Sequence, residues 1–453
     1  MKIVADLQIH SKYSRAVSPE MVIPRIWEWA KRKGIRLMAT GDWTHPLWIR
    51  EIKNHLEEMG NGILKLKMEN EKWKMDENDP FFLLATEISS IYSQGGKLRR
   101  IHTLFWVPTI DSVDKINKEL TARGANLLSD GRPIVGLSAA NLAELVLSID
   151  DKALVIPAHC WTPWFSLYGS ESGFDSVDEC FGPYAKYIYG VETGLSSDPL
   201  MNWRIKELEN RAILSFSDAH SGPKIGREAT VFNLKELSFE AIREAIIGEQ
   251  RTSSTSRGTS HIASTLEFYP EEGKYHFTGH RNCGIKQTPE ETVKKGTTCP
   301  VCGRKLTVGV MHRVEQLAGR GEIKEEELNI KKDDIGVKWI GFKNKPPFVR
   351  LVPLQEILSE TIGGMPTSVG VQTEYRKLTD ALGGEFTVLL KTPLSEIEKV
   401  SGGRVAQAIG KVRSGDIYVD PGFDGVFGKV EIWKENKEQE ARPLNEKEQL
   451  SLF

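Results

Sequence analysis

The sequence predicts an α/β protein built around a seven-unit β/α barrel, followed by a small cysteine-containing module and a mainly helical C-terminal domain. Seven short apolar runs of strand length recur in the first 260 residues, and each ends in or encloses a polar residue. Segments with the apolar spacing of amphipathic helices lie between many of these runs. Strands that alternate with helices form βαβ units, and seven such units favour closure into a barrel.

The predicted strands are the runs 3–10, 35–42, 82–87, 100–108, 153–159, 187–192 and 212–220. Helices are expected over residues 24–33, 113–123, 139–149, 201–211 and 239–247. Residues 60–80 form a Lys- and Glu-rich insertion, and the Ser/Thr/Gly stretch at 253–260 leads us to end the barrel domain at residue 264. A parallel sheet would bring the polar strand ends to one mouth of the barrel, where such folds carry their chemistry.

The rest of the chain divides into three predicted parts. Residues 265–312 form the small module, and residues 313–433 form a domain with helices at 354–361, 374–382 and 394–413 and a strand at 385–390. Residues 434–453 are polar and charged, which predicts a disordered tail.

Composition excludes several classes of protein. The 453 residues include 60 basic and 62 acidic side chains, so any basic surface must be local. No apolar run reaches the ~18 residues of a membrane span, and the N-terminus lacks the pattern of a signal peptide. Five cysteines, three of them between positions 283 and 302, indicate metal binding in a reducing compartment, so we expect a cytoplasmic protein.

Imidazoles and carboxylates gather at or just beyond the predicted strands: His10, Asp42, His45, Glu87, His102, His159, Asp218 and His220. A single histidine is usually an ordinary core or surface residue, but five at strand ends indicate metal. Such mixed ligands suit Zn, Mn or Fe rather than Ca, and Mg stays a candidate. The number of ligands predicts two or three divalent ions, and ions ~3.5–4 Å apart can activate water and hold both oxygens of a phosphoryl displacement.

A second metal pattern lies in the small module. The pairs His280–Cys283 and Cys299–Cys302 each have ligand spacing x2, and this fits a structural, tetrahedral Zn²⁺ site. His276 is the alternative to His280, and a redox-active Cys299–Cys302 pair is the alternative to zinc.

The runs DLQIHSKYS (6–14), GDWTH (41–45), TEIS (86–89), IHTLFW (101–106), PAHCWTPW (157–164) and SDAHSG (217–222) resemble the polymerase-and-histidinol-phosphatase (PHP) domain. The resemblance implies a distorted (βα)7 TIM-like barrel that hydrolyses phosphate esters with metals, with Asp218, His220, His159 and Glu87 as catalytic residues.

Two positions depart from the PHP pattern. Gln8 replaces the first histidine of an expected His-x-His, and an amide oxygen is a weaker ligand. Asp42 and His45 are separated where the family has adjacent Asp-His, so either of them could be the ligand. Asp6 is either a ligand or a residue that orients His10.

Over residues 1–433 the order of PHP barrel, Cys/His module and helical domain ending GFDGVFGKVEI (422–432) resembles the endonuclease Q family. This implies a DNA repair nuclease that cuts 5′ of deaminated bases (uracil, hypoxanthine, xanthine) or abasic sites and leaves a 3′-hydroxyl and a 5′-phosphate. Such lesions are read outside the base stack, so Tyr13, Trp161, Trp164 and Phe165 are candidates to stack on the base. Arg15, Lys224 and Arg227 are candidates to bind phosphates, and residues 313–433 are the expected DNA-binding domain.

The chain ends in QLSLF, where Gln449, Leu450, Leu452 and Phe453 resemble the clamp-binding peptide of bacterial repair proteins. The implied partner is the bacterial β sliding clamp, and the alternative is a helix end that folds back on the body. Two other functions stay open for the whole chain: a PHP phosphatase acting on a small phosphomonoester, and a non-catalytic DNA-binding scaffold.

Overall fold

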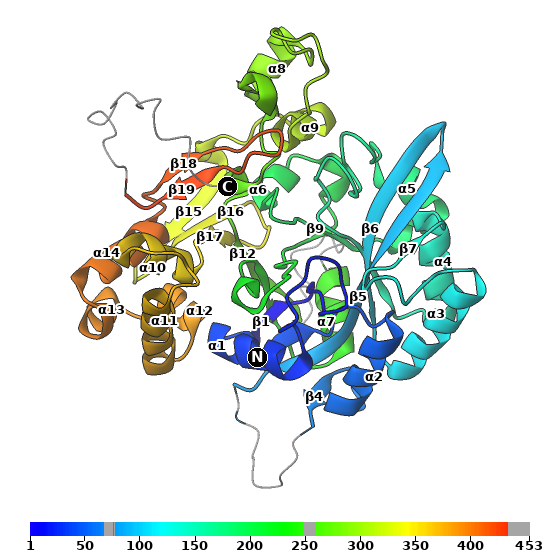
Figure 1. The fold of residues 1–453 in the computed structure, drawn as a ribbon, viewed down its shortest axis with the longest axis horizontal. Coiled ribbons are helices and arrows are strands. Elements are labelled where there is room, and N and C mark those ends of the chain that lie inside the picture. The colour runs from blue at the N-terminus through cyan, green and yellow to red at the C-terminus, as the bar shows by residue number, and fades with distance from the viewer. Residues whose placement is uncertain (68–75, 77, 249–259, 434–453) are drawn as a thin grey trace, which may run out of the picture.

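The structure is a computed structural model that describes residues 1–67, 76, 78–248 and 260–433. One mixed sheet of thirteen strands runs through it, and a separate parallel pair, β9 (Gly190–Glu192) and β10 (Ala212–Leu214), lies beside it. The sheet is central in Figure 1, with helices α2–α5 on one flank and α10–α14 on the other. The protein is thus of the α/β class that the sequence predicts.

The first strands pair as predicted. Strands β1 (Lys2–Asp6), β2 (Leu37–Ala39) and β5 (Phe81–Gln94) are parallel neighbours. Strand β11 (Ala229–Asn233) closes the other side of β1 in antiparallel register. The short strands β3 (Leu56–Glu58) and β4 (Leu64–Leu66) extend the edge beyond β5.

The prediction of a wholly parallel sheet is wrong at β6 (Lys97–Val107). Strand β6 pairs antiparallel with both β5 and β8 (Leu154–Pro157), because β5 and β6 form one long hairpin. Its turn is Gly95–Gly96, whose φ values of 61° and 72° suit a tight hairpin turn. Glu87 and His102 therefore lie inside long strands instead of at strand ends. Strand β7 (Ile134–Val135) adds to the hairpin.

Four of the five helices predicted for the barrel are present: α1 (Ile23–Lys33), α3 (Ile110–Ala122), α4 (Ala139–Ile149) and α7 (Phe239–Gly248). The structure adds α2 (Pro46–His55) and α5 (Val177–Phe181). The helix predicted at 201–211 is wrong, since only α6 (Pro199–Asn202) and a 3-10 turn at Lys206–Leu208 form there. Trp203 and Ile205 are both buried, and residues two apart do not share a helix face.

The boundary predicted at residue 264 falls within β12 (His261–Glu267), which pairs with β11 and β17 (Phe348–Arg350). Strands β16 (Lys338–Phe342) and β15 (Leu328–Lys332) continue the same sheet. The main sheet thus extends into the region we predicted as a separate domain.

The C-terminal helices are α10 (Leu354–Ile362), α11 (Val369–Leu382), α12 (Glu385–Leu390), α13 (Leu394–Ser401) and α14 (Gly403–Ser414). The strand predicted at 385–390 is instead helix α12, because Phe386 and Leu389 are buried three residues apart, on one helical face. The helix predicted at 394–413 is two helices, interrupted at Gly402, whose φ is 85°.

The small module stands away from the main sheet, at the top of Figure 1. It contains the hairpin β13 (Thr278–His280) and β14 (Ile285–Gln287) and helix α8 (Pro289–Lys295), and α9 (Val310–Leu317) follows it. The last described elements are β18 (Tyr418–Asp420) and β19 (Lys429–Glu431). No helix in the described ranges is both long enough and apolar enough to cross a membrane.

Candidate metal centre

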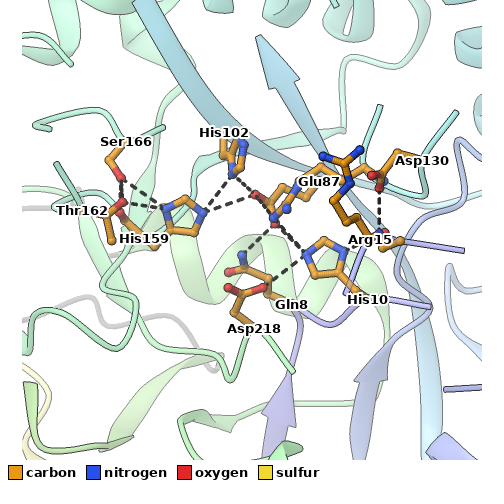
Figure 2. Close-up of polar contacts among 12 residues, drawn as sticks. Gln8, His10, Arg15, Glu87, His102, Asp130, His159, Thr162, Ser166 and Asp218 are labelled. Atoms are coloured by element: carbon orange, nitrogen blue, oxygen red, sulfur yellow. Dashed lines mark hydrogen bonds and ion pairs between the residues drawn. The ribbon is translucent and has the colours of Figure 1, made fainter. Parts of the chain in front are cut away.

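Glu87 lies at the middle of the site and contacts three histidines (Figure 2). Its Oε1 lies 2.5 Å from Nδ1 of His102 and 3.3 Å from Nε2 of His159, and its Oε2 lies 3.1 Å from Nε2 of His10. The carboxylate is 2% exposed. Strands β5 and β6 carry Glu87 and His102, so the unexpected hairpin brings these two predicted ligands together.

A second group lies next to the first, and the contact between His10 and Glu87 joins the two. Nε2 of His10 lies 3.2 Å from Oδ1 of Asp218, and the rings of His10 and His220 are 4.8 Å apart. Two sets of potential ligand atoms result, Glu87–His102–His159 and His10–Asp218–His220, each within 4.8 Å of one another. The structure therefore brings together six of the ten residues that we gave as possible ligands; Asp42, His45, Gln8 and Asp6 lie outside both groups.

The chemistry of these atoms fits divalent cations. The Oε1 atom of Gln8 is buried and accepts no hydrogen bond from any described residue, and the buried Oδ1 of Asp218 has only the ring of His10 beside it, at 3.2 Å. Buried carboxylate oxygens without donors are costly unless a cation or proton compensates them. Two adjacent clusters of imidazole nitrogen and carboxylate oxygen could hold two such ions of the borderline type.

Asp42 orients His10 from behind. Its Oδ1 lies 2.9 Å from Nδ1 of His10, and its Oδ2 accepts hydrogen bonds from Ser11 N at 2.6 Å and Ser14 Oγ at 2.9 Å. The ring is thereby turned so that Nε2 faces Glu87 and Asp218, the arrangement in which a carboxylate supports a metal-binding histidine. His45 stacks on Tyr13 with 4.4 Å between ring centroids and lies outside both ligand groups.

Asp6 supports the loop that carries Asp218. Its carboxylate accepts hydrogen bonds from the N–H groups of Ser217, at 3.0 Å, and Gly226, at 2.9 Å. Burial raises the pKa of Asp6 to about 6, even though these hydrogen bonds act in the opposite direction. The geometry therefore places Asp6 behind the site, while Gln8 donates from Nε2 to Oε2 of Glu87 at 3.1 Å.

Three of the predicted residues have left-handed backbone: Asp42 (φ 44°), His159 (φ 30°) and Asp218 (φ 47°). Such conformations cost about 1–3 kcal/mol for residues other than glycine, and they cluster at functional sites. Each of these residues directs its side chain toward the group around Glu87 and His10, so the unusual backbone serves the site.

Burial and neighbouring charges shift the pKa values of the groups in the centre. Burial opposes ionisation of Glu87, but Arg132 and His102 outweigh it and hold the pKa of Glu87 well below its usual range. Burial lowers the pKa of His102 to about 4, which leaves its imidazole neutral and able to bind a metal. Burial acts to lower the pKa of His159 as well. The hydrogen bond and the negative charge of Glu87 have the larger effect, so the pKa of His159 is raised.

The predicted DNA contacts have varied surroundings. Trp161 is 1% exposed and donates to Asn202 Oδ1, so it belongs to the core and is no open stacking surface. Trp164 and Phe165 are half-buried, and Trp164 lies edge-on to Tyr275. The three basic residues that we predicted to bind phosphates also have contacts. Nζ of Lys224 lies 2.7 Å from Glu356, Arg227 donates to the carbonyl of Ser217, and the backbone N–H of Arg15 lies 3.4 Å from Asp130 (Figure 2).

Sequence reasoning missed Arg132 and Glu192. Nη1 of Arg132 lies 3.5 Å from both Glu87 Oε1 and His10 Nε2. Glu192 is fully buried and accepts hydrogen bonds from the backbone of His159 and Gly194. Burial raises its pKa to about 8. Glu192 ends a predicted strand and could have been found by that signal, whereas Arg132 lies in a loop without a motif.

The predicted zinc ligands converge in the small module. Potential ligand atoms of His280, Cys283, Cys299 and Cys302 lie within 4.8 Å of one another. Burial opposes ionisation of Cys299, but the N–H of Cys302 and the ring of His280 lower its pKa to about 6, which favours the metal-binding thiolate. His276 lies outside this group and is 4% exposed.

Comparisons with known proteins agree with this architecture. The family model of the MJ0043 C-terminal domain matches residues 353–416. A crystal structure of PfuEndoQ, a lesion-specific endonuclease from Pyrococcus furiosus, is 32% identical with a TM-score of 0.78 and covers 96% of each chain. A structure of endonuclease Q with a 27-mer duplex carrying an abasic lesion at its active site is 32% identical with a TM-score of 0.79, covering 98% of this chain and 100% of that one.

Two uncharacterized proteins are also similar. YqxK of Bacillus subtilis is 28% identical over 448 residues, which is 95% of this chain and 99% of YqxK. MJ0043 of Methanocaldococcus jannaschii is 32% identical over 279 residues. This match spans 60% of the present chain and about a third of MJ0043, 31% of its length.

The fold and the buried histidine–carboxylate centre, together with the likeness to the Pyrococcus endonuclease, identify this protein as an enzyme, a hydrolase of the endonuclease class. The chain belongs to the endonuclease Q family, since it shares 32% identity and nearly its full length with the Pyrococcus enzyme.

Proposed function

We propose that this protein is a metal-dependent DNA repair endonuclease that cuts beside damaged bases. The observation that carries the proposal is a pair of adjacent potential metal sites, joined by the buried contact between Glu87 and His10, in a chain of the endonuclease Q family. The related complex with an abasic lesion at its active site supports damaged DNA as the substrate class. A phosphatase for a small substrate would have no use for the additional module and helical domain.

The residues of the centre would each do a distinct part of the work. Divalent ions bound there would lower the pKa of a water molecule and neutralise charge on the phosphate oxygens. Glu87, His102 and His159 would hold one ion, and His10, Asp218 and His220 the other. Asp42 keeps Nε2 of His10 directed inward, and Asp6 keeps the loop of Asp218 in place. Zn, Mn, Mg and Fe are the candidate ions.

The finer assignments rest on the family resemblance. We propose that residues 1–264 form a distorted (βα)7 PHP barrel. We propose cleavage of the phosphodiester 5′ of uracil, hypoxanthine, xanthine or an abasic site, which leaves a 3′-hydroxyl and a 5′-phosphate. The half-buried Trp164 and Phe165, and Tyr13 beside His45, are the aromatic residues whose exposure supports contact with an unstacked base.

We further propose that His280, Cys283, Cys299 and Cys302 hold one structural Zn²⁺. Four ligands saturate a tetrahedral site, so this ion would stabilise the module and take no part in cleavage. Residues 265–312 would then be a zinc module, and residues 313–433 would supply much of the DNA-binding surface. The five cysteines are all free, which agrees with a cytoplasmic enzyme.

The proposed clamp-binding residues Gln449, Leu450, Leu452 and Phe453 lie outside the described residues. A terminal Leu-x-Leu-Phe type anchor supports binding to the bacterial β sliding clamp, because buried aliphatic and aromatic anchors carry such interfaces. Removing residues 449–453 should abolish clamp binding, measured by surface plasmon resonance, and leave cleavage of free oligonucleotides intact. Clamp binding that survives the deletion would contradict this proposal.

A cleavage assay tests the main proposal. Labelled duplexes with one uracil, hypoxanthine, xanthine or abasic site, and an undamaged control, are incubated with Mn²⁺, Mg²⁺, Zn²⁺ or a chelator. We expect metal-dependent cutting just 5′ of the lesion and none of the control. Turnover of a generic phosphomonoester without cutting of any duplex would instead indicate a phosphatase, and inactivity in both assays would indicate a DNA-binding scaffold.

A further inference from the structure

The guanidinium of Arg132 enters the centre among imidazoles and carboxylates. Its Nη1 lies 3.5 Å from Oε1 of Glu87 and 3.5 Å from Nε2 of His10, and its side chain is 23% exposed. Among the described residues no other arginine or lysine contacts Glu87 or His10. Because Glu87, Asp218 and Asp42 surround it, the side chain remains cationic despite the burial that opposes its charge.

The loop that carries Arg132 is held from both sides. The N–H of Gly131 donates to the carbonyl of Tyr13 at 3.0 Å, and Thr44 Oγ1 donates to the carbonyl of Gly131 at 3.1 Å. On the far side, Ser89 N donates to the carbonyl of Pro133 at 3.0 Å, and β7 then pairs with β5. The backbone of residue 132 is therefore fixed relative to the ligands.

The close approach of this loop is possible because residue 131 is glycine. A Cβ atom at this position would lie 2.4 Å from Oδ2 of Asp42 and 2.4 Å from Oγ of Ser14. Such contacts would push apart the loop and the residues that orient His10. Glycine at position 131 therefore allows the loop to place the next residue, Arg132, close to the centre.

The contacts of Arg132 in this structure are long and few for a guanidinium. Nη1 makes two contacts at the outer limit of hydrogen-bond distance, whereas a committed arginine–carboxylate pair is commonly bidentate at about 2.7–2.9 Å. A guanidinium has five N–H donors, so several are left to recognise another planar or tetrahedral anion. The side chain is partly exposed at the mouth, which makes these donors accessible.

Cations bound by Glu87 and His10 would stand close to this fixed positive charge. Like charges at such separations repel, and the repulsion is relieved when an anion lies between them. The substrate of the proposed reaction supplies one, because a phosphodiester carries a negative charge that is spread over its non-bridging oxygens in the transition state.

We propose that Arg132 is a catalytic residue that binds a non-bridging oxygen of the scissile phosphate. This inference rests on the proposed function and extends it from the metal ligands to a residue of the chain that touches the reacting group. Arg132 would then stabilise the charge that phosphoryl transfer develops, as fixed cationic donors do in other phosphoryl-transfer enzymes.

The test compares Arg132→Gln and Arg132→Lys with wild-type protein and with the control Arg123→Gln. Arg123 directly follows α3, and its side chain is 48% exposed. We expect kcat on a lesion duplex to fall about 100-fold or more in Arg132→Gln, with partial activity in Arg132→Lys and none lost in the control. Metal content, measured by mass spectrometry, and melting temperature should stay at the wild-type values. Added guanidinium ion should partly restore Arg132→Gln.

A second readout does not depend on overall activity. In wild-type protein, sulfur in place of the contacted non-bridging oxygen should slow cleavage, and this effect should shrink in Arg132→Gln, whose contact is already lost. Cleavage by Arg132→Gln within threefold of wild type, an unchanged sulfur effect, or loss of metal together with activity would each overturn the proposal. Failure of wild-type protein to cut any lesion duplex would instead contradict the proposed function.

Discussion

Nζ of Lys33 lies 2.6 Å from Oε2 of Glu385, and the two side chains are only 1% and 4% exposed. Lys33 ends α1, beside the first strands of the sheet, and Glu385 begins α12 in the C-terminal helices. Glu385 also accepts hydrogen bonds from Tyr375 OH at 2.8 Å and Leu354 N at 3.0 Å. A buried ion pair thus joins the part of the chain that carries the metal centre to the helical part.

Removing the positive charge should destabilise this junction. In Lys33→Met the carboxylate of Glu385 stays buried without its counter-charge, which typically costs about 3–5 kcal/mol. We expect a lower free energy of unfolding in urea. The double variant Lys33→Met/Glu385→Gln should recover much of it, because no buried charge remains, the amide oxygen still accepts from Leu354 N, and the amide NH2 can donate to the hydroxyl of Tyr375. A single variant as stable as wild type would show that the pair contributes nothing.

Asp218→Ala should separate cleavage from binding. The variant loses an oxygen ligand at the centre, so we expect cleavage of a lesion duplex to fall at least about 100-fold. Affinity for the same duplex, measured by fluorescence anisotropy, should change little, since the DNA-binding surface that we propose for residues 313–433 is left intact. Asp111→Ala, at a 71% exposed position of α3, is the matched control. Full cleavage by Asp218→Ala would remove this residue from the centre.

Asp42→Asn tests whether Asp42 positions His10. The amide cannot replace the carboxylate that faces Nδ1 of His10, Ser11 N and Ser14 Oγ together, so the ring should lose its fixed orientation. Outer partners of this kind are worth about 10–100-fold in metal affinity. Titration of metal-free protein with Mn²⁺, followed by calorimetry, measures the loss. Affinity equal to that of the exposed-site variant Asp114→Asn would contradict the role.

Glu267 should make stability depend on pH. Burial raises the pKa of Glu267 to about 8 from an ordinary 4.5, although Ser215 Oγ donates to it at 2.6 Å. Between these values the folded protein keeps a proton that the unfolded chain releases, so this group's stabilising contribution is full below 4.5 and is lost as the pH rises toward 8.

Glu267→Gln removes that titration. We expect the variant to gain stability relative to wild type as the pH rises from about 5 to about 8, by up to about 1.4 kcal/mol per pH unit. Urea unfolding of both proteins at several pH values gives the difference. Glu240→Gln, 62% exposed on α7, should show no such gain. A constant difference between Glu267→Gln and wild type would contradict the expectation.

Cys299→Ser should empty the proposed zinc site. The ion is expected to fall from one per chain toward none, with a lower melting temperature for the module. Val301→Ser changes a 69% exposed side chain in the same turn and should keep the metal. Zinc-free wild-type protein with a Cys299–Cys302 disulfide would favour the redox alternative.

Much of the centre could be predicted from single residues at the ends of apolar runs. His10, His159 and Asp218 lie where the strand pattern placed them, and the spacing of the cysteines was enough to group all four zinc-type ligands. The sequence could not decide between Asp42 and His45, because only the folded loop shows which of the two faces His10.

The features that the sequence did not reveal depend on long-range strand pairing, on a run too short to show a period, or on the path of a loop. The Gly95–Gly96 turn was a local signal for a hairpin, but strand-by-strand alternation favoured a parallel order and hid it. At 385–390 the apolar run was too short to separate a strand from a buried helix by periodicity. Arg132 belongs to no pattern, because its role comes from the loop that Gly131 allows to approach Asp42.

The left-handed backbone at Asp42, His159 and Asp218 has a consequence for how such a protein changes over generations. Glycine at any of these positions would relieve an unfavourable conformation. A copy that no longer cleaved its substrate would therefore lose little by discarding these side chains and could become more robust. Selection for folding alone would let them drift, and only selection for the chemistry would retain them.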